Sequence, residues 1–266
     1  MIRTAWVLAV RRALWIVVMV MPPLIPCARA DAQAAARTTV TNANAWFSYT
    51  GDHPVARGSK TGVHLELQAR RSDLGADWQQ FLARGGVSRT LAPAVRVAAG
   101  YAFVRTYPYG AAPVLAEFPE HRLWQQLSVA HAIGPVALMH RYRLEQRRSG
   151  VTGGDPTQLD RVTDWRHTNR VRYHARVTLP LGSTSPVLDR LYVTAWNELF
   201  VSFGQRVQLN VFDQTRTGVA LGRQLTPTVR AEAGYLLQYV LKSTGRDAER
   251  NHTLHVALFS SAPLPF

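Results

Sequence analysis

Residues 168–181 read Thr-Asn-Arg-Val-Arg-Tyr-His-Ala-Arg-Val-Thr-Leu-Pro-Leu, and polar and apolar side chains alternate along them. Successive side chains of a β-strand point to opposite faces, so this alternation predicts a strand with one apolar and one charged face. An average soluble strand has five or six residues, whereas a tilted membrane strand needs roughly 9 to 11. The length of the run therefore favours a membrane strand. Its charged face carries Arg170, Arg172, His174 and Arg176.

The same alternation recurs in five other segments, at 63–70, 95–103, 136–147, 191–201 and 229–241. Lipid requires an apolar outer face and a partner for every backbone hydrogen-bonding group, and a closed barrel with a polar interior meets both requirements. A soluble β-sandwich would also alternate, but it would not usually gather arginines on one strand face and aliphatic side chains on the other. We therefore predict an all-β fold, an antiparallel up-and-down transmembrane β-barrel.

The lengths of the connections also alternate along the chain. Short turns are predicted near 91–93, 134–135, 182–189 and 225–227, and longer loops over 106–120, 148–167 and 242–250. Bacterial barrels typically have short periplasmic turns, longer external loops and an even number of strands. When the connections are assigned alternately to the two sides of the membrane, starting from the C-terminus, the first strand-like segment, 42–50, begins on the side opposite to the one expected. Ten strands are therefore favoured, and twelve remain possible, from candidate segments at 42–50, 62–71, 79–90, 94–106, 120–133, 135–147, 168–181, 189–203, 211–224, 228–241 and 251–261.

The N-terminal segment has the pattern of an export signal. Basic residues within 3–12 precede an apolar run at 13–25, and Ala28-Arg29-Ala30 offers small residues to a signal peptidase. A transmembrane anchor is the rival interpretation, but three prolines within 22–26 interrupt the run before the roughly 20 residues that a spanning helix needs. We predict a signal peptide at 1–30, cleaved before Asp31, and an outer-membrane β-barrel domain at 31–266.

Cysteine usage and charge narrow the chemistry. The single cysteine, Cys27, lies in the signal segment, where Pro26 argues against lipidation, so the exported chain has no thiol for a disulfide or a metal. The 31 basic residues include four arginines within 1–30, which leaves 31 − 4 = 27 basic against 17 acidic residues. An exported protein rarely meets nucleic acid, so we expect no nucleic-acid partner. The excess of basic residues is more consistent with contacts to lipid phosphates or lipopolysaccharide, or with a charged lumen.

Several short motifs carry a resemblance to a known family. They are Arg-Leu-Trp-Gln-Gln at 122–126, His-Arg-Tyr-Arg-Leu-Glu-Gln-Arg at 140–147, Asn-Arg-Val-Arg-Tyr at 169–173, Asn-Glu-Leu-Phe at 197–200, Phe-Asp-Gln-Thr-Arg at 212–216, Gly-Tyr-Leu-Leu-Gln at 234–238 and Asn-His at 251–252. Their order and spacing resemble the uncharacterised domain of unknown function 2490 family of predicted bacterial outer-membrane β-barrel proteins. The resemblance implies a barrel in the outer membrane and no known activity.

The candidate site is a set of charged side chains predicted to face the barrel interior. Adjacent strands bring facing side chains within about 5 Å, so each glutamate of the set can lie between arginines. One interpretation is a salt-bridged plug, for which the bidentate arginine fork is well suited. The other is an anion-selective pore in which the surplus arginines attract solutes. The set comprises Arg122, Arg141, Arg143, Glu145, Arg147, Arg170, Arg172, Arg176, Glu198, Arg216, Arg230 and Glu232.

An outer-membrane enzyme acting on lipid or lipopolysaccharide is the alternative function. The sequence contains neither a Gly-x-Ser-x-Gly nucleophile elbow nor a His-Glu-x-x-His metal motif. His252 and His255 are three residues apart and should point to opposite faces of a strand, and His140 is predicted to face lipid. We therefore assign no catalytic, cofactor-binding or metal-binding residue and expect no cofactor. Trp124 and Trp196 are predicted to point inward and fill the lumen.

The C-terminus fits a barrel only in part. The terminal aromatic Phe266 is of the kind that the barrel-assembly machinery reads, but Pro263 and Pro265 cannot donate ladder hydrogen bonds, so 261–266 should leave the wall. The expected partners are outer-membrane lipid, lipopolysaccharide and the assembly machinery; the oligomeric state stays open. The predicted protein is a structural or narrow passive, anion-preferring channel in the bacterial outer membrane after signal-peptide cleavage.

Overall fold

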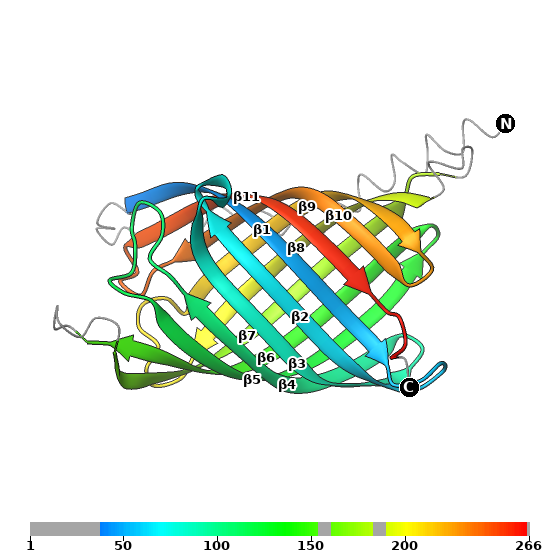
Figure 1. Cartoon of the computed structure of the whole chain (residues 1–266), viewed down its shortest axis with the longest axis horizontal. Helices are drawn as coiled ribbons and strands as arrows, with labels where there is room; N and C mark the ends of the chain where they lie inside the picture. Colours follow the sequence, from blue (N-terminus) through cyan, green and yellow to red (C-terminus); the bar gives the residue numbers. More distant parts are fainter. Residues whose placement is uncertain (1–37, 154–160, 183–189, 265–266) are drawn as a thin grey trace, which may run out of the picture.

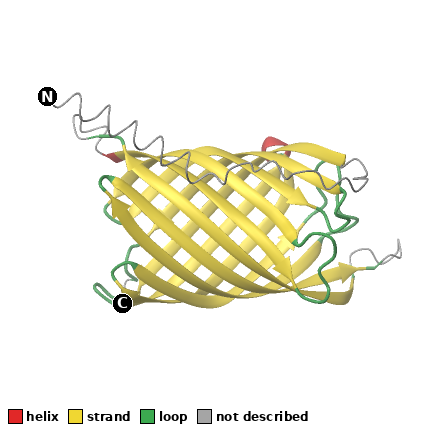
Figure 2. Ribbon diagram, turned by 180° about the vertical axis from the view of Figure 1, so that it is seen from behind, coloured by secondary structure: helices red, strands yellow, loops and turns green. Residues whose placement is uncertain are grey.

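The computed structural model describes residues 38–153, 161–182 and 190–264. The predicted signal peptide at 1–30 and the terminal Phe266 lie outside these residues. The described chain forms eleven β-strands and one short 3-10 turn, η1 (Asp73–Gly75) (Figures 1 and 2). The strands are β1 (Thr38–Pro54), β2 (Thr61–Ser72), β3 (Asp77–Ala92), β4 (Val95–Thr106), β5 (Phe118–Ile133), β6 (Val136–Thr152), β7 (Val162–Pro180), β8 (Leu191–Phe203), β9 (Phe212–Thr226), β10 (Val229–Leu241) and β11 (Asp247–Ser260).

The strands close into a barrel in which sequence neighbours pair antiparallel and β1 pairs with β11. The closing pair is parallel and runs from Thr38↔Asp247 to Gly51↔Ser260, with β1 and β11 side by side in Figure 1. Closure leaves no edge strand with unpaired backbone groups. Among the described residues, no helix is long and apolar enough to cross a membrane.

The expected strand number is therefore wrong. The barrel has eleven strands, neither ten nor twelve, and the segment around Trp46 is a full wall strand. Strands joined by consecutive hairpins alternate in direction, so the first and the eleventh run the same way and must pair parallel. The even count assumed that every neighbouring pair is antiparallel, as in a purely up-and-down barrel. Membrane barrels with an odd number of strands do exist.

The connections separate into two ends. The turn end contains the connections at 55–60, 93–94, 134–135 and 227–228, and the last strand finishes there at Ser260. The loop end contains those at 73–76, 107–117, 204–211 and 242–246, and β1 begins there at Thr38. The predicted short connection at 182–189 lies outside the described residues apart from its first residue. The chain thus enters and leaves the barrel at opposite ends.

The two faces of the wall have opposite character. Large apolar side chains stand exposed on the outside, as with Val87 (62% exposed), Leu123 (59%) and Leu254 (54%), and Tyr101 and Tyr142 lie among them. Soluble proteins bury side chains of this kind and expose charged ones. In this barrel many charged side chains, such as Arg143 and Glu145, are inside and buried. The alternation of the sequence therefore corresponds to an apolar outside and a polar inside.

Glycines make room for the two large indoles of the interior. Trp124 and Trp196 are both buried and point inward, as predicted. A Cβ on Gly218 would lie 2.2 Å from Cζ2 of Trp196, and a Cβ on Gly86 would lie 2.6 Å from Cζ2 of Trp124. Each indole therefore covers the glycine of a neighbouring or nearby strand, which lets it lie flat against the inner wall instead of protruding along the barrel axis.

The segment after β11 leaves the wall but stays attached to it. The strand ends at Ser260, and residues 261–264 are not in a strand. The Leu264 amide donates to the Pro54 carbonyl at 2.9 Å, and His53 Nδ1 lies 2.7 Å from the Ala262 carbonyl oxygen. These contacts hold the segment against the end of β1 at the turn end.

Candidate functional site

The twelve predicted interior residues all lie on the inward phase of their strands. They come from β5 to β10, and the register pairs Glu145 with Arg170, Arg143 with Arg172 and Glu198 with Arg216 across neighbouring strands. Long side chains on one face of a sheet reach their cross-strand partners directly. The wall alone therefore places glutamates among arginines over half of the barrel circumference.

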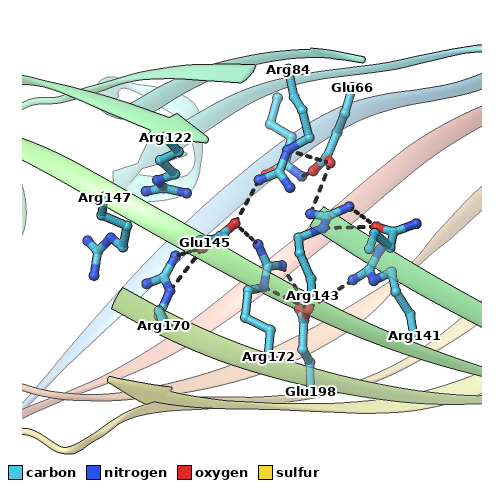
Figure 3. Close-up of polar contacts among 12 residues, drawn as sticks. Glu66, Arg84, Arg122, Arg141, Arg143, Glu145, Arg147, Arg170, Arg172 and Glu198 are labelled. Atoms are coloured by element: carbon cyan, nitrogen blue, oxygen red, sulfur yellow. Dashed lines mark hydrogen bonds and ion pairs between the residues drawn. The ribbon is translucent and has the colours of Figure 1, made fainter. Parts of the chain in front are cut away.

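Glu145 is the centre of the network (Figure 3). Its Oε1 accepts from Arg84 Nη2 at 3.0 Å and from Arg172 Nη1 at 2.9 Å, and its Oε2 accepts from Arg170 Nη2 at 2.7 Å. The glutamate has no surface accessible to water. Arg84 belongs to β3, so its bond spans the interior rather than following the wall. One carboxylate on β6 thus connects β3 and β7 through the interior.

Glu198 forms the second node of the network. Its Oε1 accepts from Arg172 Nη2 at 2.7 Å and from Arg141 Nη2 at 2.8 Å, and its Oε2 lies 4.0 Å from Arg216 Nη1. Arg172 therefore bridges Glu198 and Glu145, and a continuous chain of charged groups crosses the lumen (Figure 3). Hydrogen bonds between ionised partners are short and strong, which favours a single arrangement of the interior.

The third predicted glutamate belongs to a separate group. Glu232 pairs with Arg176 and accepts from Tyr192 Oη at 2.8 Å, and Arg230 Nε lies 3.7 Å away. None of these groups contacts Glu145 or Glu198 within ion-pair distance among the described residues. The predicted set therefore divides into a central network and a smaller cluster near the turn end.

Four further charged residues complete the network and were not in the predicted set. Glu120 accepts from Arg122 and Arg147, at 2.6 and 2.5 Å to their Nε atoms. Asp213 pairs with Arg170 at 2.7 Å, and Glu66 lies 3.2 Å from Arg84 and 3.4 Å from Arg143. The predicted set has nine arginines and three glutamates, and these additions bring the numbers to ten arginines and six carboxylates, so the surplus of arginine is smaller than the predicted set alone indicates. The sequence could have identified Glu66 as an interior residue, because it lies on the polar phase of 62–71. Arg84 is harder to identify, because the two glycines that follow it interrupt the alternation of polar and apolar side chains.

One buried arginine has no carboxylate partner among the described residues. Arg70 donates from Nε to Gln68 Oε1 at 2.9 Å and from Nη1 to Gln80 at 2.5 Å. Its guanidinium lies 4.3 Å from the ring centre of Trp46, and Arg216 lies 5.0 Å from the same ring. Both guanidinium groups are therefore within the distance at which an indole ring attracts a cation.

Buried side chains from every strand point into the barrel. Every strand contributes at least one inward side chain that is less than a tenth exposed. An eight-stranded barrel is just wide enough to be filled by side chains, and eleven strands can still be filled when arginine and tryptophan dominate. The buried residues, one from each strand, are Trp46, Arg70, Arg84, Ala102, Trp124, Arg143, Arg170, Phe200, Arg216, Leu236 and Asn251.

The loop end is covered by the connection between β4 and β5. From residues 107–117, Tyr109 Oη donates to Glu249 Oε2 at 2.6 Å, and the Ala111 amide donates to Asn42 Oδ1 at 3.1 Å. Burial, and then the adjacent Glu249 carboxylate, raise the pKa of the Tyr109 phenol, so it stays a donor at neutral pH. The loop thus reaches past β3 and β2 to bind β1 and β11.

A cavity of about 590 Å³ opens at the turn end. Its rim includes the exposed turn residues Pro93 and Pro227, and its inner surface includes Glu198, Arg172 and Arg216 of the central network. The central network thus forms part of the inner surface of this cavity.

The histidines form no metal centre in the described chain. His255 points inward, with Nε2 at 3.1 Å from Ser48 Oγ, and His252 points outward to Tyr235 at 2.6 Å, so they lie on opposite faces as predicted. His140 lies on the outward phase and contacts Tyr173 at 2.8 Å. No group of three histidine, aspartate, glutamate or cysteine side chains among the described residues is placed to hold one metal ion.

Comparison with known proteins finds a sequence family and a similar fold among solved structures. The chain is similar to a structure titled "NanC porin structure in rhombohedral crystal form", with 14% identity and a TM-score of 0.42, over 78% of this chain and 93% of that one. No curated protein matches. The sequence profile of one family matches residues 43–249, which is most of the barrel. This chain belongs to that family, which is described as Protein of unknown function (DUF2490).

Proposed function

We propose that this protein is an integral outer-membrane β-barrel whose interior is plugged by its own side chains, so that it is not an open pore. The observation that carries the proposal is the reversed polarity of the wall. Exposed valine, leucine and tyrosine side chains cover the outside, while ionised groups such as Arg143 and Glu145 are buried inside. A closed barrel with this polarity suits a hydrocarbon surrounding, where an exposed charge or an unpaired strand edge would be costly.

The proposal includes a route to the membrane. Export would depend on residues 1–30 as a cleaved signal peptide, and insertion on the barrel-assembly machinery acting on the C-terminal region. Lipid and lipopolysaccharide would then contact the outer face, with Tyr101, Tyr142 and Tyr235 at the level of the headgroups. The exposed positions of these tyrosines among aliphatic residues support such contacts.

Closure favours the plug over an anion-selective pore. A conducting lumen needs a water-filled path, whereas Arg84 and Arg143 join Glu66 and Glu145 across the middle of the barrel. Removing a partner would leave a buried charge uncompensated, which is strongly unfavourable. The network therefore resists opening.

Location and folding are tested by cell fractionation and gel migration. The protein should be recovered in the outer membrane and should migrate differently on a gel before and after boiling, because a closed barrel resists the detergent until it is heated. Recovery as a soluble periplasmic protein would contradict the proposal. So would identical migration of heated and unheated samples from the membrane fraction.

Planar-bilayer recordings distinguish the plug from the pore. We expect no steady conductance from the purified wild-type protein. An anion-selective conductance that loses its selectivity in Arg143→Glu or Arg172→Glu would instead establish the pore. Arg223→Glu is the control, because it makes the same change of charge at an exposed residue on the outward phase of β9.

A further inference from the structure

The turn-end cavity has two chemically different walls. One consists of apolar side chains from four strands, namely Trp46, Trp196, Leu236 and Phe259. Three of these, with Ala220, form a single buried cluster. The facing wall comes from β6 and β7. It presents Arg141, Arg172 and His174 to the same space.

The charges that line the cavity do not balance. Six arginines belong to it: Arg96, Arg141, Arg172, Arg176, Arg216 and Arg230. The carboxylates that line it are Asp52, Glu66 and Glu198, and Glu145 and Glu232 pair with Arg172 and Arg176 from behind. Six cations against these five anions leave an excess of 6 − 5 = 1 positive charge. Glu66 and Glu145 are also shared with arginines outside the cavity, namely Arg84 and Arg143. A low-dielectric chamber strengthens the attraction of such an excess for an anion.

Polar side chains that line the cavity or lie behind it are incompletely paired. Nε of Arg141, Nε of Arg216 and Oε2 of Glu232 have no hydrogen bond within the described chain. Buried polar groups are rarely left unsatisfied. This end of the interior is therefore less completely paired than the central network around Glu145.

The cations nearest the opening are accessible and held in place. The side chains of Arg230 and Arg96 are 44% and 40% exposed. The guanidinium of Arg230 lies 4.6 Å from the ring centre of Phe259, and that of Arg176 lies 5.5 Å from it. Stacking on a ring fixes an arginine without neutralising it. Arg230, which also lies 3.7 Å from Glu232, is thus accessible to an incoming anion beside an aromatic surface.

We propose that the turn-end cavity binds a small organic anion with an apolar body, namely a carboxylate or phosphate group attached to an aromatic or aliphatic skeleton. The anionic group would lie among the arginines, and the skeleton would lie against the indole wall. The volume of about 590 Å³ is within the range of small-ligand sites. This inference rests on the proposed closed lumen, because the central network is the floor that makes the cavity a binding site instead of a passage.

Titration calorimetry on the folded, detergent-solubilised full barrel tests the proposal. The probes are benzene-1,3-dicarboxylate and phenyl phosphate, with the neutral benzene-1,3-dicarboxamide and inorganic phosphate for comparison. We expect 1:1 binding of at least one aromatic anion, no binding of the diamide, and at least about tenfold weaker binding of inorganic phosphate. The aromatic anion that binds identifies the preferred group. Failure of both aromatic anions to bind would overturn the proposal, as would equal binding of the diamide.

Matched arginine variants locate the site. Arg230→Gln should weaken binding of the aromatic anion by at least about tenfold. Arg223→Gln, on the exposed outward phase near the same end, should leave it unchanged. Gel migration before and after heating confirms that both variants are folded. Equal affinity of Arg230→Gln and wild type would overturn the assignment to this cavity.

Failure of this inference is distinguishable from failure of the proposed function. A membrane barrel that is silent in bilayers and binds none of the aromatic anions contradicts the binding site and leaves the plug intact. A steady conductance contradicts the closed lumen itself, whether or not an aromatic anion binds.

Discussion

The network depends on what arginine and glutamate can do at close range. A carboxylate has two oxygens and accepts several hydrogen bonds, and the planar guanidinium donates from more than one nitrogen at once. Glu145 uses both properties, since three arginines from two sides of the barrel converge on it. A lysine presents its donors from one nitrogen and lacks the planar fork with which Arg172 joins Glu145 and Glu198.

Neutralising the central carboxylate should destabilise the barrel. Glu145→Gln keeps the size of the side chain but leaves three buried arginines with less compensation, so we expect a loss of about 3–5 kcal/mol in the free energy of unfolding. Glu117→Gln is the control, because Glu117 pairs with Arg105 at the surface. That exposed pair should contribute about 0–1 kcal/mol. Urea unfolding of both variants in lipid vesicles measures the difference, and equal losses would contradict the role of Glu145.

At the level of strands, the closing pair is what distinguishes this barrel from an even-stranded one. The β1 and β11 strands run parallel, whereas all other pairs are antiparallel. Hydrogen bonds of a parallel pair are evenly spaced but slanted, and the pairing is slightly less stable per residue. The length of the β1–β11 pair, which extends over nearly all of β1, offsets this difference.

A disulfide can test the parallel register directly. In a Cys27→Ser background, Ala43→Cys with His252→Cys should cross-link on mild oxidation, because these exposed positions are partners in the closing pair. The unfolded, unreduced chain would then carry a large closed loop and migrate differently on a gel. Ala43→Cys with Val256→Cys is the control, four residues and about 13 Å further along the strand. Cross-linking of the control pair alone, or of neither pair, would contradict the eleven-stranded closure.

The whole molecule has two unlike ends, and their difference gives the barrel a direction. The turn end opens into the arginine-lined cavity, whereas the loop end is covered by the connection at 107–117. Short turns usually face the periplasm in bacterial barrels. The cavity should therefore receive its ligand from the periplasmic side, and the covered end should face the exterior.

Labelling of single cysteines in intact cells can establish this direction. In the Cys27→Ser background, Gln205→Cys at the loop end should react with a membrane-impermeant maleimide. Arg57→Cys at the turn end should react only after the outer membrane is permeabilised. Both side chains are exposed, so access and not burial decides the outcome. The reverse pattern would place the cavity at the cell surface.

Much of this architecture was predictable because it is local. The period-two alternation identified the inward and outward faces of the strands, and it placed Trp124 and Arg143 inside and Tyr142 outside as the structure does. Backbone geometry alone couples successive residues to opposite faces, so no knowledge of the partner strand is needed. The family resemblance was likewise readable from motif order, and the profile match confirms it.

The features that the sequence did not predict depend on contacts between residues far apart in the chain. Whether 42–50 joins the wall depends on β11, about two hundred residues later, and hence the strand number was wrong. The hydrogen bond from Arg84 to Glu145 joins residues 61 positions apart through the interior. The pattern within a single strand does not predict such a contact.

The amino-acid pattern alone specifies long strands with an apolar and a charged face. Only the assembled barrel shows that eleven strands close through a parallel pair, that their charged faces form one ion-pair network, and that a cavity lies at one end. The physical reason is that backbone geometry within a strand sets the face on which each side chain lies. The closure of the barrel and the contents of its interior depend instead on which strands pair and in what register.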